Sequence, residues 1–116
     1  FNKNPNYLRN VAKAKFYSGF QKEGLLEISR IIRDESTNYI NFMYRAEMNL
    51  TLDKTEDAIA DLERSLGIQK TERALMLLAE LYNNQGETSK ACEIWVIAKK
   101  DFKSKEAKAQ LKLNCK

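Results

Sequence analysis

Histidine is absent from this chain of 116 residues. Its absence removes the side chain that most often acts as a general base and most often binds metal ions. The two cysteines lie 23 positions apart and form no C-x-x-C pair, so they cannot build an ordinary zinc site. Glycine-rich nucleotide-binding signatures are missing as well. We therefore expect no catalytic residue, no metal site and no cofactor.

Residues that interrupt helices are scarce, with one proline and four glycines. So few breakers favour helices over a β fold with many turns. The hydrophobic content of 43% and charged content of 31% are typical of a globular chain, and the length corresponds to one domain. No apolar run approaches the roughly 20 residues that a membrane-spanning helix needs. The chain opens at Phe1 with no visible signal peptide, which is consistent with a processed product or an excised fragment.

Positive charge is concentrated at the end of the chain. Residues 99–116 contain seven lysines against two acidic residues, hence a net charge of +5, whereas the whole chain carries +4. A surface for nucleic acid would combine arginines with several aromatic rings. The cations here are all lysines with one aromatic neighbour, Phe102, so a solvated face of a terminal helix is the preferred interpretation and nucleic acid is not an expected partner.

The sequence repeats itself with a period of 33 to 34 residues. Small residues recur at Gly24, Ala58 and Ala91, and a large apolar residue follows each of them four positions later. These large residues are Ile28, Leu62 and Trp95. Twelve positions before each small residue stands another small one, which is Ala12, Ala46 or Ala79. Four positions before that stands a bulky residue, which is Leu8, Phe42 or Leu75. The pattern predicts three helix pairs with small residues where two helices approach closely.

Apolar residues at spacings of three and four mark the buried face of each predicted helix. Gly86 is expected to end a helix, and Thr55, Thr71, Thr88 or Ser89, and Ser104 are expected to cap the starts of others. Residues 2–6 are interpreted as a lead-in. The expected repeats cover about residues 5–36, 38–70 and 71–102, and a capping helix covers about residues 104–115.

These positions resemble the tetratricopeptide repeat family. Repeat two contains Arg45-Ala46 at the usual Leu-Gly position and Ala58-Ile59-Ala60-Asp61-Leu62 in its second helix. Repeat three matches through Leu78-Ala79, Tyr82, Gly86, Ala91 and Ala98. The resemblance implies an all-α fold: an α-solenoid of three helix-turn-helix repeats and a C-terminal capping helix, seven helices in one domain of residues 1–116.

In this family the first helix of each pair lines a concave face, and the resemblance implies that a peptide or another protein binds there. Ile40, Met43 and Met76 would supply adaptable apolar contact area, and Arg9 and Arg73 could pair with acidic groups. About half of the candidates are expected only to pack adjacent repeats. The candidate residues are Asn6, Arg9, Asn10, Lys13, Tyr17, Ile40, Met43, Tyr44, Glu47, Arg73, Met76, Leu77, Glu80 and Asn84.

Family members that bind chaperones grip a terminal carboxylate with a set of lysine, asparagine and arginine side chains. The matching positions here contain Arg9, Lys13, Tyr44, Arg73 and Leu77. Since only Arg9 and Arg73 preserve the charge, that activity is not expected.

The C-terminal segment resembles the ends of many bacterial tetratricopeptide proteins, notably from Bacteroidetes, through Ala91-Cys92-Glu93-Ile94-Trp95 and the later Ala107, Leu111 and Cys115. Exported proteins are common in that group, which would permit a Cys92–Cys115 disulfide. The alternative is two buried thiols. An exported or periplasmic location is preferred to a cytoplasmic one.

Three functions remain open. The leading hypothesis is a monomeric interaction scaffold or adaptor without catalytic activity. The second is a structural part of a larger, envelope-associated assembly, in which case the protein would be an oligomer. The third is binding to an anionic surface through the lysines of the last helix.

Overall fold

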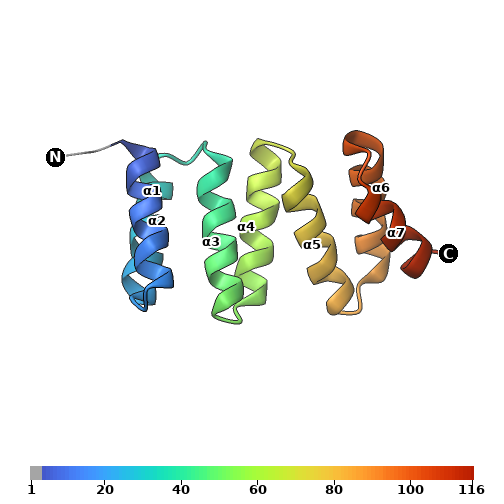
Figure 1. Cartoon of the computed structure of the whole chain (residues 1–116), viewed down its shortest axis with the longest axis horizontal. Coiled ribbons are helices and arrows are strands. Elements are labelled where there is room, and N and C mark those ends of the chain that lie inside the picture. Colours follow the sequence, from blue (N-terminus) through green and yellow to red (C-terminus); the bar gives the residue numbers. More distant parts are fainter. Residues whose placement is uncertain (1–3) are drawn as a thin grey trace. The chain divides into compact units, whose positions relative to one another are not determined.

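The computed structural model describes residues 4–116. In this range all regular structure is α-helical, and consecutive helices form antiparallel pairs (Figure 1). The all-α fold with seven helices is therefore confirmed. The helices are α1 (Pro5–Tyr17), α2 (Gln21–Asp34), α3 (Tyr39–Thr51), α4 (Thr55–Ile68), α5 (Glu72–Asn84), α6 (Thr88–Phe102) and α7 (Lys105–Asn114).

Contacts divide the chain into two compact units, which meet in the sequence between Ile68 and Gln69. Unit 1 contains the helix pairs α1/α2 and α3/α4, and unit 2 contains the pair α5/α6 followed by α7. The grouping of residues 1–116 in a single domain stays a prediction.

The core of unit 1 is built mainly from the predicted apolar faces of its helices, to which the fully buried Met48 is an addition that the sequence did not predict. Its buried cluster comprises Ala12, Phe16, Ile28, Ile32, Phe42 and Met48. Leu8 belonged to the predicted buried face of α1 but is 37% exposed. The reason is that Leu8, Val11 and Ile31 border an open depression between α1 and α2. The buried interpretation of Leu8 was wrong.

The closest approach in unit 1 occurs where Gly24 of α2 meets α1. A Cβ atom at Gly24 would lie 2.7 Å from the Ala12 carbonyl oxygen and 2.7 Å from both the Phe16 nitrogen and Cβ. Real Cβ atoms do not tolerate such distances, so this crossing admits only a glycine without a backbone shift. The prediction that a small residue marks a close helix contact is confirmed here.

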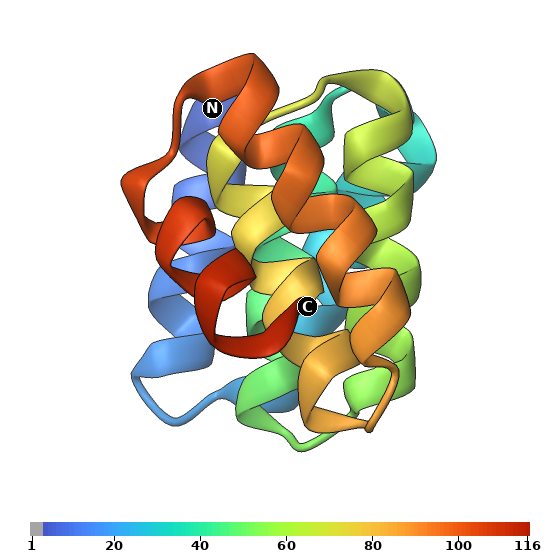
Figure 2. The same ribbon diagram turned by 90° about the vertical axis from the view of Figure 1, so that its right-hand side faces the viewer.

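In unit 2 the pair α5/α6 buries alanines at the corresponding positions, Ala79 and Ala91, and α7 packs against α6 (Figure 2). Ala107 of α7 is completely buried. A disulfide joins Cys92 of α6 to Cys115 at the end of α7, with Cα atoms 5.9 Å apart. The last helix is therefore attached to its neighbour both by packing and by a covalent bond.

Two of the predicted helix caps are confirmed. Thr71 accepts a hydrogen bond from the Ala74 amide at 3.3 Å, and Ser104 accepts one from the Ala107 amide at 3.1 Å. Gly86 has a φ of 82° and follows the end of α5, as predicted. Such a left-handed conformation suits glycine because it has no Cβ.

The other predicted helix starts are wrong by one or two residues. Thr55 and Thr88 are the first residues of α4 and α6 rather than their caps, and Ser89 lies inside α6. The Ala58 amide donates to the Lys54 carbonyl and the Ala91 amide to the Glu87 carbonyl, so each helix begins one residue earlier.

The N-terminal lead-in is also shorter than expected. Pro5 occupies the first turn of α1, where its missing N–H costs nothing, and Asn6 is helical as well. The Asn4 side chain caps this helix by accepting a hydrogen bond from the Asn6 amide at 2.8 Å. Residues 2 and 3 of the expected lead-in lie outside the described residues.

We predict that Gly24→Ala destabilises the protein. The added methyl group would meet backbone atoms of α1 that cannot move independently, and overpacking of this kind costs about 1–3 kcal/mol. Urea denaturation followed by far-UV circular dichroism measures the change in the free energy of unfolding.

Gly67→Ala is the matched control. A Cβ at Gly67 meets no atom within 4 Å, and the residue lies in α4, where alanine is favoured over glycine by up to about 1 kcal/mol. This variant should be as stable as the wild type or more so. Equal stability of the two variants would show that the α1/α2 crossing tolerates a wider separation.

Candidate functional site

The candidate binding surface of unit 1 is formed by α1 and α3, and is called here the inner face of unit 1. Every candidate residue that the sequence gave for the first two repeats lies on one of these helices. Asn6, Asn10, Lys13 and Tyr17 of α1 are exposed; Ile40, Tyr44 and Glu47 of α3 are half-buried; Arg9 and Met43 are buried.

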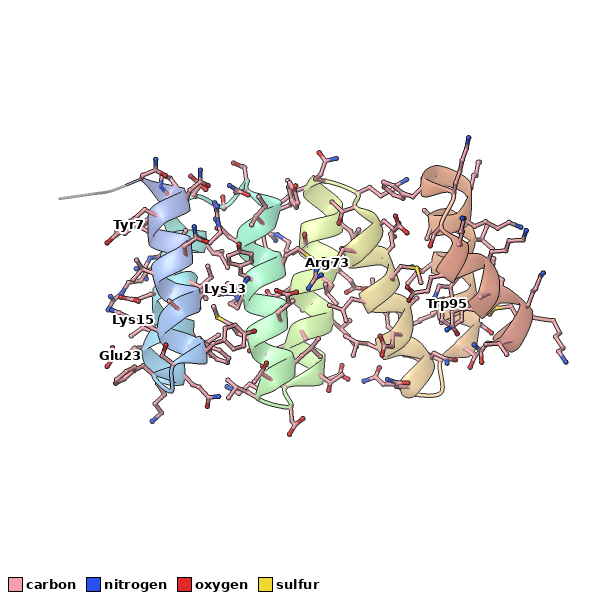
Figure 3. All side chains as sticks on the ribbon, in the orientation of Figure 1. Tyr7, Lys13, Lys15, Glu23, Arg73 and Trp95 are labelled. Carbon is pink, nitrogen blue, oxygen red and sulfur yellow. A yellow bond between two sulfur atoms is a disulfide. The ribbon has the colours of Figure 1, made fainter. Side chains whose placement is uncertain are left out.

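The contact between Lys13 and Tyr44 brings the two helices together on this face. The Lys13 Nζ lies 4.7 Å from the centre of the Tyr44 ring, a distance at which the cation is attracted to the aromatic face. Tyr44 also packs against the core cluster of unit 1, which fixes its position. Lys13 lies between α1 and α3 (Figure 3). The Tyr44 ring and the Lys13 ammonium group therefore belong to one surface. Tyr17 is exposed and lies four residues after Lys13 in α1, hence on the same side of that helix.

Arg9 does not supply a free cation to the inner face. Its Nε donates to Asn41 Oδ1 at 2.6 Å and its Nη1 donates to Asn6 Oδ1 at 2.6 Å. Its Nη2 lies 3.6 Å from Glu35 Oε1, and the residue as a whole is only 3% exposed. The guanidinium is thus occupied in joining α1 to the loop before α3 and to α3 itself. Its expected role as a surface cation is corrected to a structural one.

Met43 was also expected to offer contact area, but it is 7% exposed. Its thioether side chain is almost entirely inside the structure and cannot meet a ligand without a rearrangement. The apolar area that remains available on α3 comes from the half-buried Ile40 and Tyr44. The binding surface of unit 1 is therefore smaller and more polar than the sequence predicted.

A second polar network lies between α3 and α4. Arg45 makes two parallel hydrogen bonds to the Asp61 carboxylate, from Nε to Oδ2 at 2.9 Å and from Nη2 to Oδ1 at 2.8 Å. Asn49 donates to the same carboxylate at 3.1 Å. The hydrogen bonds to Asp61 raise the pKa of Arg45 above its already high usual value. Arg45 therefore stays charged and acts as a link between the two helices of the pair.

The candidate residues of repeat three all lie on α5, and a polar cavity adjoins them. The cavity has a volume of about 280 Å³ and is called here the unit 2 cavity. From α5 it is lined by Met76, Glu80, Asn83 and Asn84. Arg73 and Leu77 also belong to α5 but do not line it.

The helix α7 contributes to the unit 2 cavity, which the sequence did not predict. Glu106 and Gln110 of α7 face the α5 residues across it, and Trp95 of α6 completes the lining. The sequence signal for α7 was its buried stripe, which includes Ala107. That stripe implied only a cover for the last helix pair. The exposed residues on either side of Ala107, among them Glu106, were the sequence feature that could have indicated a contribution of α7 to a site.

Within the part of the chain that the structure describes there is neither a cluster of metal ligands nor a membrane-spanning helix. No group of three or more cysteine, aspartate and glutamate residues within residues 4–116 is arranged to hold a metal ion. In the same range no helix combines the length and the apolar character that crossing a membrane requires.

Comparisons with known proteins identify the fold. No family model matches the sequence, and no curated protein matches it either. Among solved structures, the N-terminal domain of stress-induced protein-1 (STI-1) from C. elegans is similar over 100% of both chains, with a TM-score of 0.86 and 12% sequence identity.

Two crystal structures of MamA are also similar, with TM-scores of 0.73 and 0.72 and 19% identity. They match 84% of this chain, which spans only 57% and 54% of the MamA chains. Identities this low show the fold alone. The fold is accordingly tetratricopeptide-like, as the repeat pattern predicted.

We predict that Arg9→Met lowers the stability of the protein. Methionine keeps most of the buried apolar volume, but Asn41, which is completely buried, loses its donor. Leaving a buried acceptor without a partner costs about 1–3 kcal/mol. The free energy of unfolding from urea denaturation measures the effect.

Lys22→Met on α2 is the control. Lys22 is exposed, so the free energy of unfolding should change by no more than about 0.5 kcal/mol. If Arg9→Met were equally harmless, the guanidinium would contribute nothing to the fold and would be available to a partner.

Proposed function

We propose that this chain is a non-catalytic adaptor that binds a peptide segment of another protein, and that the inner face of unit 1 is a binding surface for it; α5 offers unit 2 a surface of its own. The observation that carries the proposal is the composition of the inner face. It combines the exposed Tyr17 with the half-buried Ile40 and Tyr44, and Lys13 adds a mobile charge. Aromatic and aliphatic side chains that remain partly accessible beside polar groups are typical of surfaces that bind proteins.

The fold supports the same class of function. By analogy from the fold, tetratricopeptide-like domains are generally protein-protein interaction modules and typically lack catalytic activity. The similarity to the STI-1 domain, with a TM-score of 0.86, is consistent with a fold of this class. The coupling of Tyr44 to the core gives the inner face a rigid anchor, which lowers the entropic cost of binding.

Recognition of a free C-terminal carboxylate is not part of the proposal. Of the two positions that preserved a suitable charge, Arg9 is buried and bonded to Asn41 and Asn6. The exposed cation of the inner face of unit 1 is Lys13, and it lies over an aromatic ring. This arrangement favours an internal peptide segment that has apolar side chains and at most one acidic side chain beside them.

We predict that Ile40→Glu and Tyr44→Glu each weaken peptide binding. Peptides selected against the wild type from a random display library should lose about tenfold or more in affinity, since a buried anchor of an interface contributes at least that much. Fluorescence polarisation with labelled peptides measures the affinities, and far-UV circular dichroism checks the helical content of each variant.

Ala60→Glu serves as the control. Ala60 is exposed on α4, away from the inner face, so binding should persist in this variant. Equal loss in all three variants, or in none, would exclude the inner face as the binding surface. A stable oligomer of the wild type in light scattering would instead favour a structural role in a larger assembly.

We also propose that the protein works in an oxidising compartment, as an exported or periplasmic protein of a bacterium. The Cys92–Cys115 disulfide supports this, because disulfides persist outside the reducing cytoplasm. The resemblance of the C-terminal segment to exported bacterial proteins points in the same direction.

Protein alkylated during isolation from its native source should take up label on neither cysteine until a reductant is added, and then on both. The reductant should also lower the free energy of unfolding by about 3 kcal/mol, from the lost closure of a loop of this length. A Cys115→Ser variant should not respond to the reductant. Two labelled thiols before reduction would refute the oxidising compartment.

A further inference from the structure

The unit 2 cavity has a chemical character that the general adaptor function does not explain. Its lining combines two carboxylates, which only accept hydrogen bonds, with three amide side chains, which both donate and accept. Glu80 and Glu106 project from different helices, and neither has an ion-pair or hydrogen-bond partner among residues 4–116. Two unpaired carboxylates that border one cavity create a negative potential inside it.

The amide side chains around the cavity have already used part of their capacity. Asn83 Oδ1 accepts a hydrogen bond from the Thr88 hydroxyl at 3.0 Å, and Gln110 Oε1 accepts one from the Asn114 amide at 2.8 Å. Each amide oxygen has two lone pairs, so both can still accept. A ligand that fits this lining must therefore bring several donors.

Trp95 provides an independent indication of a ligand. Its side chain, labelled in Figure 3, lines the cavity. The residue is 2% exposed, and its buried indole N–H has no acceptor among the described residues. Buried polar groups are nearly always hydrogen-bonded, so an orphaned donor beside a cavity indicates a missing partner. The ligand should therefore carry at least one acceptor together with its donors.

An arginine residue within a peptide meets both requirements. Its guanidinium has five N–H donors in a planar fork and always carries a positive charge, which suits two carboxylates and the amide oxygens. The backbone carbonyl of the peptide supplies an acceptor. A volume of about 280 Å³ admits a side chain of this size, whereas a folded domain could not enter it.

We propose that the unit 2 cavity is a subsite for an arginine side chain of a bound peptide, held by Glu80 and Glu106 and bordered by Trp95. This subsite rests on the proposed peptide-binding function and adds a sequence preference to it. The partner would contain an arginine in the segment that meets α5 and α7.

The only tryptophan of the chain makes the test direct, because Trp95 gives the single indole cross-peak in a ¹H–¹⁵N correlation spectrum. The probe is the blocked tripeptide acetyl-Gly-Arg-Gly-amide. Its control is the same peptide with citrulline, which has almost the same shape but no charge. The arginine peptide should shift the indole cross-peak with a saturable dependence on concentration, and citrulline should bind about tenfold more weakly because charge-assisted hydrogen bonds are lost.

Glu80→Gln and Glu106→Gln should each lower the affinity for the arginine peptide by about tenfold. Both residues are exposed and the substitutions are isosteric, so the fold should survive, which far-UV circular dichroism checks. Glu93→Gln is the matched control, since Glu93 is an exposed carboxylate of α6 outside the cavity. No shift at millimolar peptide would mean that water alone fills the cavity, and equal shifts with both peptides would mean that the charge of arginine is not recognised. Either result would overturn the proposal.

Different experimental results would refute the arginine subsite and the adaptor function. If the indole cross-peak does not respond while Ile40→Glu and Tyr44→Glu still lose the selected peptides, only the arginine subsite is refuted. If those two variants keep the selected peptides, the proposed binding face of unit 1 is refuted whatever the tripeptide does.

Discussion

The fold depends on the close approach of the two helices in each pair. At the first crossing the contact is between backbones, because the place that a Cβ of Gly24 would occupy already belongs to the Ala12 carbonyl and to Phe16. The other two crossings use alanines that are completely buried, Ala58 and Ala91. A short distance at this point lets the large residues four positions later, such as Ile28, fill the space beside it. Packing at the density of protein interiors then follows from one small residue in each pair.

Polar networks add specificity to this packing in unit 1. Arg9 connects α1 to Asn41 and to the loop that precedes α3, and Arg45 connects α3 to Asp61 of α4. Breaking a buried charged network by removing one member is costly, although such networks contribute little net stability compared with apolar packing. Their effect here is to hold the helices that carry Lys13 and Tyr44 at a defined separation. The inner face is thus positioned by charged groups whose hydrogen bonds are made within the protein.

The repeat, the helix pairs and the small residues could be predicted because periodic spacing in the sequence maps directly onto a helix surface. The roles of the individual polar residues could not. Arg9 and Arg73 occupy comparable places in the pattern, yet Arg9 is 3% exposed and donates to the buried Asn41 of α3, whereas Arg73 is exposed. The contribution of Glu106 to a cavity depended on the angle at which α7 crosses α6, and sequence spacing does not contain that angle. Thr55 and Thr88 were misplaced because a threonine is equally acceptable at a cap and in the first turn.

The separation of Gly24 and Trp95 into different units has a consequence for how the molecule unfolds. Trp95 emission reports on unit 2 alone, whereas helical ellipticity reports on both units. Coincident transitions of the two signals would mean that the units unfold as one cooperative system, and distinct midpoints would mean that each melts independently. Trp95 is therefore a natural probe of unit 2, and a substitution at Gly24 perturbs unit 1. Together they allow the coupling free energy between neighbouring repeats to be measured.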